Sequence, residues 1–161
     1  MRKQIDPIAQ FMQEHDEMLL QLSSLNRATT SIVQHGFSAD AHRRVVASLR
    51  FIEDEVGVHN KREEEALFPV LERYVEGPTL LMRQDHKLLK KEFIRLRRAV
   101  TKLEINPNSK KNARELETVA KTIVQRFVNH IHKENHILFP LVQKFLTKDA
   151  LREVARRMLQ P

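Results

Sequence analysis

The sequence contains no cysteine, and glycine occurs only three times among its 161 residues. Without cysteine the chain forms no disulfide, offers no thiolate and cannot hold zinc or an iron–sulfur cluster through sulfur. Any metal must therefore be held by nitrogen and oxygen. Scarce glycine and abundant Leu, Glu, Lys, Arg, Ala and Val favour helix over sheet, so we expect an all-α protein. The length suits one domain with its own core, to which we assign residues 1–161.

Long apolar runs are also absent. No run approaches the roughly 20 residues needed to cross a bilayer, and none follows the basic residues after Met1. We therefore expect no membrane partner and a soluble, cytoplasmic protein. The net charge of +7 is compatible with nucleic-acid binding, but the basic residues are spread beside acidic ones without interleaved aromatics. This distribution favours a solvated surface over a nucleic-acid partner.

Proline and glycine divide the chain into long segments whose apolar residues recur at helical spacing. Asp6 and Pro7 mark the start of the first segment, and Gly36 marks its end. Short connections between long helices predict an up-down four-helix bundle. The expected helices cover about residues 7–35, 40–74, 78–104 and a fourth segment beyond the turn at 106–109, with a short C-terminal fifth helix over 147–159.

The apolar stripe of each helix is expected to face the core. Pro69 and Pro140 lie inside helical patterns, where each removes a backbone donor and should kink or end its helix. Members of the expected stripes include Ile8, Met12, Leu19 and Leu22 in the first segment and Phe127, Ile137 and Leu141 in the fourth.

Each stripe is interrupted by polar residues that are costly to bury alone. A glutamate follows a histidine by four residues in the second segment and again in the fourth, so the paired side chains differ by only about 40° around the helix and share one face. The interrupting residues are His15, His59, Glu63, His86, His130 and Glu134.

These interruptions obey an internal repeat. His15 and His59 are 44 residues apart, and so are His86 and His130. A shift of 71 residues maps the first pair, Glu63 and the motif Leu-Phe-Pro at 67–69 onto the second pair, Glu134 and the same motif at 138–140. We interpret this as a helical hairpin used twice, over about 7–75 and 78–146. The pseudo-twofold symmetry predicts a symmetric site with two metals, each bound by two imidazoles and bridged by the two glutamates.

The cost of burying carboxylates without a cation favours a metal. An ionised carboxylate isolated in an apolar core would protonate or recruit a cation, and two carboxylates with four imidazoles form a ligand set. Imidazole and carboxylate suit iron, manganese or zinc, and carboxylate bridges favour a redox-active pair such as two irons. The sequence leaves zinc and manganese open.

Two segments carry a family resemblance: His59-Asn-Lys-Arg-Glu63-Glu-Glu-Ala-Leu-Phe-Pro69 and His130-Ile-His-Lys-Glu134-Asn-His-Ile-Leu-Phe-Pro140. With the two single histidines, they resemble the signatures of the hemerythrin-like, or HHE cation-binding, family. The resemblance implies a hemerythrin-like bundle with two oxo- or hydroxo-bridged iron ions and an open position for a small ligand. Oxygen-carrying hemerythrins have a further histidine at the place of Lys90 and an aspartate at the place of Glu134, which puts reversible oxygen carriage in doubt.

Two functions compete on this basis. The first is a non-haem di-iron protein that binds or senses a diatomic ligand, oxygen or nitric oxide. The second is a di-iron enzyme acting in oxidative or nitrosative stress, which reduces peroxide or nitric oxide, oxidises iron, or donates iron for repair of iron centres. A third hypothesis is a basic helical module without metal that binds nucleic acid or a protein. The sequence does not decide between carrier, sensor and enzyme, and it leaves a homo-oligomer open.

Other polar residues are expected to lie outside the site. His35 is 20 residues beyond His15, about 30 Å along a straight helix, and His42 is similarly remote from His59. We expect solvated side chains for the acidic neighbours of the six candidates, and no partner that orients the imidazoles can be named. The residues placed outside the site are His35, His42, His132 and His136, and the acidic ones expected in solvent are Glu14, Asp16, Glu64, Glu65 and Asp85.

Overall fold

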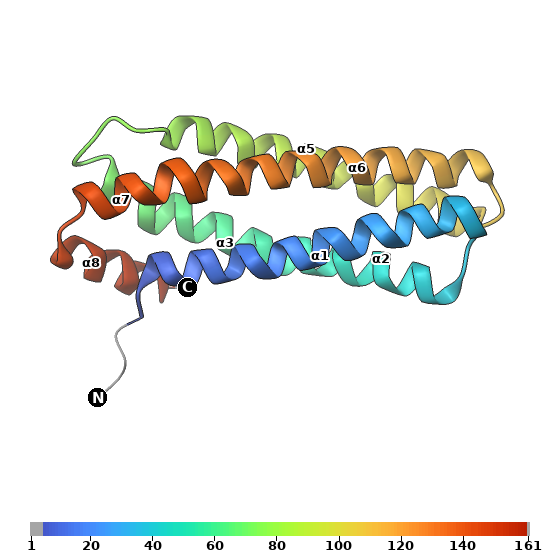
Figure 1. Ribbon diagram of the computed structural model, residues 1–161, viewed down its shortest axis with the longest axis horizontal. Helices are drawn as coiled ribbons and strands as arrows, with labels where there is room; N and C mark the ends of the chain where they lie inside the picture. The colour runs from blue at the N-terminus through green and yellow to red at the C-terminus, as the bar shows by residue number, and fades with distance from the viewer. Residues whose placement is uncertain (1–4, 161) are drawn as a thin grey trace.

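The computed structural model describes residues 5–160, so the basic residues next to Met1 lie outside the described part of the chain. Four long helical rods lie side by side along one axis, and a shorter helix crosses one end (Figure 1). The rods are α1 (Pro7–His35); α2 (Ala39–Phe51), η1 (Ile52–Val56), α3 (Gly57–Arg62), η2 (Glu63–Leu67) and α4 (Phe68–Leu71); α5 (Thr79–Ile105); and α6 (Lys110–Lys133), η3 (Glu134–Leu138) and α7 (Phe139–Phe145), followed by the short α8 (Lys148–Met158).

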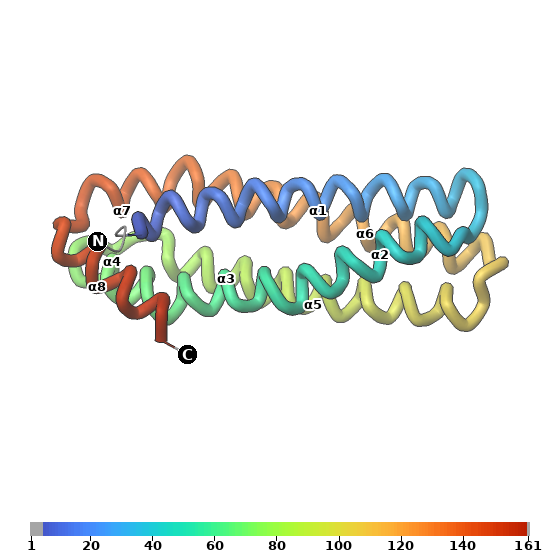
Figure 2. The backbone as a smooth tube through the Cα atoms, turned by 90° about the horizontal axis from the view of Figure 1, so that it is seen from below, coloured from blue at the N-terminus to red at the C-terminus, as the bar shows by residue number. Residues whose placement is uncertain are grey.

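Consecutive rods run antiparallel. The connections before α2 and before α6 lie at one end of the bundle, and those before α5 and before α8 lie at the other (Figures 1 and 2). α8 turns back beneath this second end, close to the start of α1. The predicted all-α, up-down four-helix bundle with a short fifth helix is confirmed, and no segment within residues 5–160 forms a strand. None of the described helices is long and apolar enough to span a membrane.

Local capping explains where α1 begins and ends. The Asp6 side chain accepts hydrogen bonds from the amides of Ile8 and Ala9, and Pro7 occupies the first turn, where its missing N–H costs nothing. Gly36 ends the helix with φ of 87°, a conformation that a side chain disfavours. Ser38, Ser109 and Thr147 cap α2, α6 and α8 in the same manner as Asp6.

Neither Pro69 nor Pro140 ends its helix. Each is preceded by a π-helical turn, η2 or η3, in which the amide of Phe68 or Phe139 donates to the carbonyl five residues earlier. The wider turn accommodates a residue that has no amide hydrogen, so the helix continues into α4 and α7. The carbonyls that accept these bonds belong to Glu63 and Glu134, so both π turns begin at the candidate metal ligands.

The apolar core forms two clusters with the six candidate residues between them along the rods. On α1, Phe11 belongs to the cluster nearer α8, Met18 belongs to the longer cluster, and His15 lies between them. The expected stripe of α1 was partly wrong, because Met12 and Leu19 are 42% and 37% exposed. The true stripe advances by alternate steps of three and four residues through Phe11, His15 and Met18. Ile137 is exposed as well, because η3 adds a residue to the turn and Leu138 takes the buried place.

Candidate metal centre

The six candidate residues come together in the middle of the bundle, and each is at most 6% exposed. They form two overlapping groups whose possible ligand atoms lie within 4.8 Å of one another. One group holds the first histidine pair, the other holds the second pair, and both glutamates belong to both groups. The fold therefore brings together two histidines on each side and two shared glutamates, in the arrangement that the sequence predicts. The residues are His15 on α1, His59 on α3, Glu63 on η2, His86 on α5, His130 on α6 and Glu134 on η3.

The Nε2 atoms of the four histidines point at the carboxylates. The two Nε2 atoms are 3.1 Å apart within the His15–His59 pair and 3.1 Å apart within the His86–His130 pair. Glu63 reaches both pairs, with Oε1 3.0 Å from His59 Nε2 and Oε2 3.2 Å from His86 Nε2. Glu134 Oε1 closely contacts His130 Nε2 and is 4.0 Å from the Nε2 of both His15 and His86.

The other ring nitrogen of each histidine faces an oxygen acceptor. The Nδ1–H of His15 donates to Asn135 Oδ1 at 2.7 Å, and that of His86 donates to Glu64 Oε1 at 2.7 Å. The acceptor assigns the proton to Nδ1, because amide and carboxylate oxygens cannot donate.

The second histidine of each pair has a carboxylate in the same place. Asp85 Oδ2 accepts from His130 Nδ1 at 3.1 Å, and Glu14 Oε1 lies 3.5 Å from His59 Nδ1. Such partners orient metal-bound imidazoles and make them better ligands. In its neutral form each ring therefore turns the lone pair of Nε2 toward the two glutamates.

The carboxylate oxygens of Glu63 and Glu134 have no hydrogen-bond partner. All four are buried, and their contacts with the imidazoles lack hydrogen-bond geometry. Four Nε2 lone pairs and four carboxylate oxygens thus surround one small volume that contains acceptors and no dedicated donor. Burying two uncompensated carboxylates is costly, so the volume requires positive charge, either protons or metal cations. The residues fit a metal site.

Without a cation, protons supply part of this charge. Burial lowers the pKa of His59, but the carboxylates of Glu63 and Glu14 outweigh it and raise that pKa to about 10. For His86, burial is again outweighed, here by Glu134, Glu63 and Glu64, and the pKa rises to about 10. Burial lowers the pKa of His15 to about 4. For Glu63, burial raises the pKa, but the neighbouring His59 outweighs this effect and holds that pKa well below its usual range. A metal must therefore displace protons from His59 and His86.

The orienting partners of the imidazoles correct part of the sequence analysis. Glu14, Asp85 and Glu64 were expected in solvent, but Glu14 and Asp85 are only 21% and 16% exposed at the side chain and Glu64 bonds a buried imidazole. The repeat carries the signal that would have found them, because a shift of 71 relates Glu14 to Asp85 and Glu64 to Asn135.

The same shift reaches one contact further out. It relates Arg62 to Lys133, and each of these cations lies beside the acidic partner of its own half-site: Arg62 is 3.7 Å from Glu14, and Lys133 contacts Asp85 closely. The repeat therefore relates the candidate ligands, the residues that orient them and the cations beside those residues.

The remaining histidines lie away from this site, as expected. His35 is exposed in the last turn of α1, and His42 pairs with Glu104 at 3.3 Å. His132 and His136 are exposed, with their ring centroids 4.1 Å apart. Lys90 is exposed too, so it does not replace the further histidine of oxygen-carrying hemerythrins.

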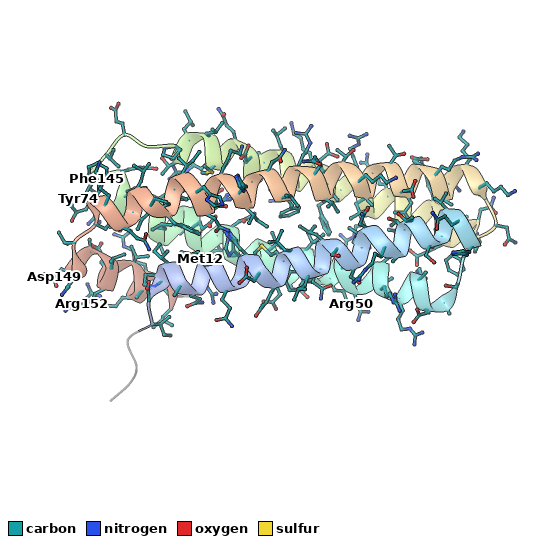
Figure 3. All side chains as sticks on the ribbon, viewed as in Figure 1. Met12, Arg50, Tyr74, Phe145, Asp149 and Arg152 are labelled. Carbon is teal, nitrogen blue, oxygen red and sulfur yellow. The ribbon has the colours of Figure 1, made fainter. Side chains whose placement is uncertain are left out.

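The described surface carries both basic and acidic side chains. In the view of Figure 3, side chains tipped with nitrogen and with oxygen are interspersed along the bundle. Exposed basic residues pair with acids on neighbouring helices, as Arg97 does with Glu53 at 3.0 Å and Arg73 with Glu153 at 2.9 Å.

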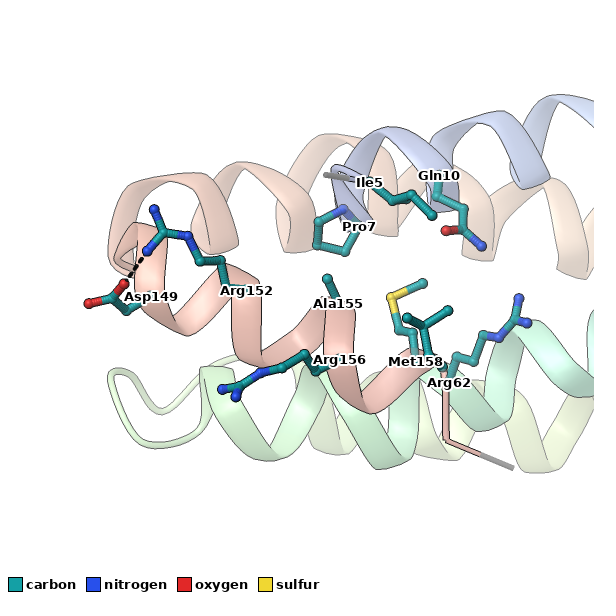
Figure 4. Close-up of a pocket in the computed structure, with 10 residues that line it drawn as sticks. Ile5, Pro7, Gln10, Arg62, Asp149, Arg152, Ala155, Arg156 and Met158 are labelled. Carbon is teal, nitrogen blue, oxygen red and sulfur yellow. Dashed lines mark hydrogen bonds and ion pairs between the residues drawn. The ribbon is translucent and has the colours of Figure 1, made fainter. Parts of the chain in front are cut away.

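A cavity of about 580 Å³ lies between the start of α1 and α8, away from the six candidates. Figure 4 shows Pro7, Ala155 and Met158 at its centre, while the arginines point to its edges and Arg152 pairs with Asp149. Because these cationic groups diverge, the cavity does not resemble a site for an anion, and the chemistry lies with the six buried residues.

Comparison with protein families now bears on this geometry. The family described as the hemerythrin HHE cation binding domain matches residues 6–142 and, in a second overlapping match, residues 77–160. The chain belongs to this family. The second match begins 71 residues after the first, the same shift that relates the two hairpins. Membership implies a bound cation, and the two histidine and glutamate groups fit a metal site.

The chain is also similar to curated proteins named for iron–sulfur cluster repair. It is 25% identical over 137 residues to the iron-sulfur cluster repair protein YtfE of Yersinia pestis (strain Pestoides F), covering 83% of this chain and 61% of that protein. For the YtfE of Yersinia pseudotuberculosis serotype IB (strain PB1/+), the identity is 27% over the same shares. The chain thus spans less than two thirds of the length of these relatives.

Proposed function

We propose that this chain binds a pair of iron ions between its four long helices and uses them to bind or sense a diatomic ligand, oxygen or nitric oxide. In this proposal one iron is held by His15 and His59, the other by His86 and His130, and the two glutamates bridge them. Bound iron would supply a redox-active centre able to bind a small ligand.

The observation that carries the proposal is the convergence of eight acceptor atoms. Two carboxylates, each buried and without a hydrogen-bond partner, face both histidine pairs, so each can contact two cations at once. Imidazole and carboxylate ligands together suit iron, with manganese and zinc as alternatives. The doubled histidine pair supports two metals rather than one, and the family membership supports a cation of this kind.

Apolar packing around the histidines supports a small ligand. The ring of Phe11 meets His59 edge-on at 5.2 Å, Phe139 stacks on His15 at 5.5 Å, and Phe68 stacks on His86 at 6.0 Å. A site enclosed in this way excludes bulky polar substrates and suits a diatomic gas.

Anaerobic loading with ferrous iron, followed by desalting and admission of oxygen or nitric oxide, tests this proposal. We expect about two irons per chain and an optical change that reverses when the gas is removed. Replacing Glu63 or Glu134 by Ala should remove a bridge and cause loss of at least one iron. The matched control is Glu65→Ala on the same turn, whose exposed side chain contacts none of the six residues. Iron retained by both bridge variants would contradict the ligand assignment.

A second candidate function follows from the relatives, which are named for repair of iron–sulfur clusters. In it the same centre acts in oxidative or nitrosative stress, as an enzyme or as a donor of iron. Incubating the iron-loaded chain with a cluster-depleted protein separates the two candidates. Iron lost by this chain and gained by the acceptor supports repair, whereas a reversible optical change without transfer supports binding or sensing.

A further inference from the structure

The two halves of the candidate site have identical inner residues and different surroundings. Each half contains two imidazoles, and the two halves share the same two carboxylates. Around them, the shift of 71 residues preserves charge at two of three places, because Glu14 corresponds to Asp85 and Arg62 to Lys133. At the third place charge is not preserved: Glu64 corresponds to Asn135.

This substitution changes charge with little change of geometry. Glu64 accepts from His86 Nδ1 at 2.7 Å, and Asn135 accepts from His15 Nδ1 at the same distance. A carboxylate acceptor makes the imidazole a stronger donor to a metal than an amide does and places one more negative charge near the cation. The half-site of His86 and His130 therefore has the more basic imidazole and one more negative charge among its orienting partners.

The other differences between the halves oppose one another. His130 Nδ1 is closer to Asp85, at 3.1 Å, than His59 Nδ1 is to Glu14, at 3.5 Å, which favours the second half. Lys133 is also closer to Asp85 than Arg62 is to Glu14, which reduces that advantage. Among the described residues, the side chains of Glu64 and of Asn135 each contact the imidazole alone as a polar partner, so no neighbouring cation reduces the difference between them.

We propose that the two iron positions differ in affinity, that the position of His86 and His130 binds ferrous iron more tightly, and that Glu64 and Asn135 set the difference. This inference rests on the proposed iron pair. Loss of an orienting partner typically costs 10- to 100-fold in metal affinity. The Glu64 side chain is 39% exposed, so solvent screens it and we expect about 10-fold, the lower end of that range.

Stepwise anaerobic titration of the full chain with ferrous iron against a coloured chelator measures the two binding constants. A separation of the steps alone decides nothing, because two cations also repel each other across the bridges. Isosteric variants do decide. With a 10-fold difference between positions, Glu64→Gln lowers the first constant by about fivefold and the second by only about twofold. Asn135→Asp raises the second constant by about fivefold and the first by about twofold.

Equal positions give the reverse pattern. Glu64→Gln would then mainly lower the second constant and Asn135→Asp would mainly raise the first, and this result would overturn the inference while leaving the iron pair intact. Glu65→Gln, the same charge change one residue away on an exposed side chain, should leave both constants unchanged. If it acted as Glu64→Gln does, long-range charge would replace the Glu64 contact as the cause. A chain that binds no iron would overturn both this inference and the proposed function.

Discussion

Proton displacement is the most quantitative consequence of the site geometry. The pKa values of His59 and His86 are raised to about 10, so in the metal-free chain both imidazoles carry a second proton at pH 7. Those protons lie on nitrogens that a metal requires as bare lone pairs. One of these rings lies in each proposed iron position, so each of the two binding constants should rise about tenfold per pH unit, and their product about 100-fold, or about 2.7 kcal/mol per pH unit.

Two assays measure this number. Competition with a chelator of known protonation constants, between pH 6 and 8.5, gives the slope of the apparent affinity against pH. Calorimetry in two buffers of different ionisation enthalpy gives the protons released at a single pH. Zinc serves as a redox-inert probe in both assays. We expect close to one proton released per metal bound, two for the filled pair, and a slope near one for each binding constant.

A matched variant separates this effect from general electrostatics. His132→Ala removes an exposed imidazole on the outside of the bundle and should leave the slope unchanged. A slope near zero for the unmodified chain would refute the reasoning, because it would mean that His59 and His86 are neutral before the metal binds and that no protons compensate the buried glutamates.

Three further predictions concern stability and metal content. The metal-free chain should lose stability as pH rises from about 6.5 to 10, because the protonated rings of His59 and His86, whose pKa values are raised, stabilise the folded state. Chemical unfolding at pH 6.5 and 9.5 measures this loss, and equal unfolding midpoints would contradict it. Leu67→Ala, at a fully buried position beside Glu63 on η2, should cost about 2–5 kcal/mol in the free energy of unfolding, whereas the half-exposed Leu81→Ala should cost much less. Metal analysis of His42→Ala should give the same iron content as the unmodified chain, and a loss would place a ligand where the structure has none.

Much of the fold could be predicted from local signals that act within a few residues. Asp6 followed by Pro7, and Gly36 at the far end, determine the limits of α1 because a capping side chain and a left-handed glycine each act on adjacent backbone. The stripe positions were less predictable, since Met12 lies next to Phe11 and either can continue a helical period from Ile8. Only packing against the other rods decides between them.

The candidate site was predictable because six costly interruptions obey one repeat. Its surroundings were not predicted, since charged residues such as Glu14 and Asp85 are normally solvated and their burial depends on which helix lies opposite. The π turns at Glu63 and Glu134 were missed for a related reason: backbone propensity favours ordinary helix, and at these two places the wider turn accommodates a following proline that lacks an amide hydrogen.

The central claim is that two irons lie between Glu63 and Glu134. The most direct test is an anomalous difference map, recorded at the iron absorption edge, from crystals grown or soaked anaerobically with ferrous iron. We expect two peaks, one beside His15 and His59 and one beside His86 and His130, with the glutamates between them. Density confined to surface groups such as His132 and His136, with none between the glutamates, would contradict it.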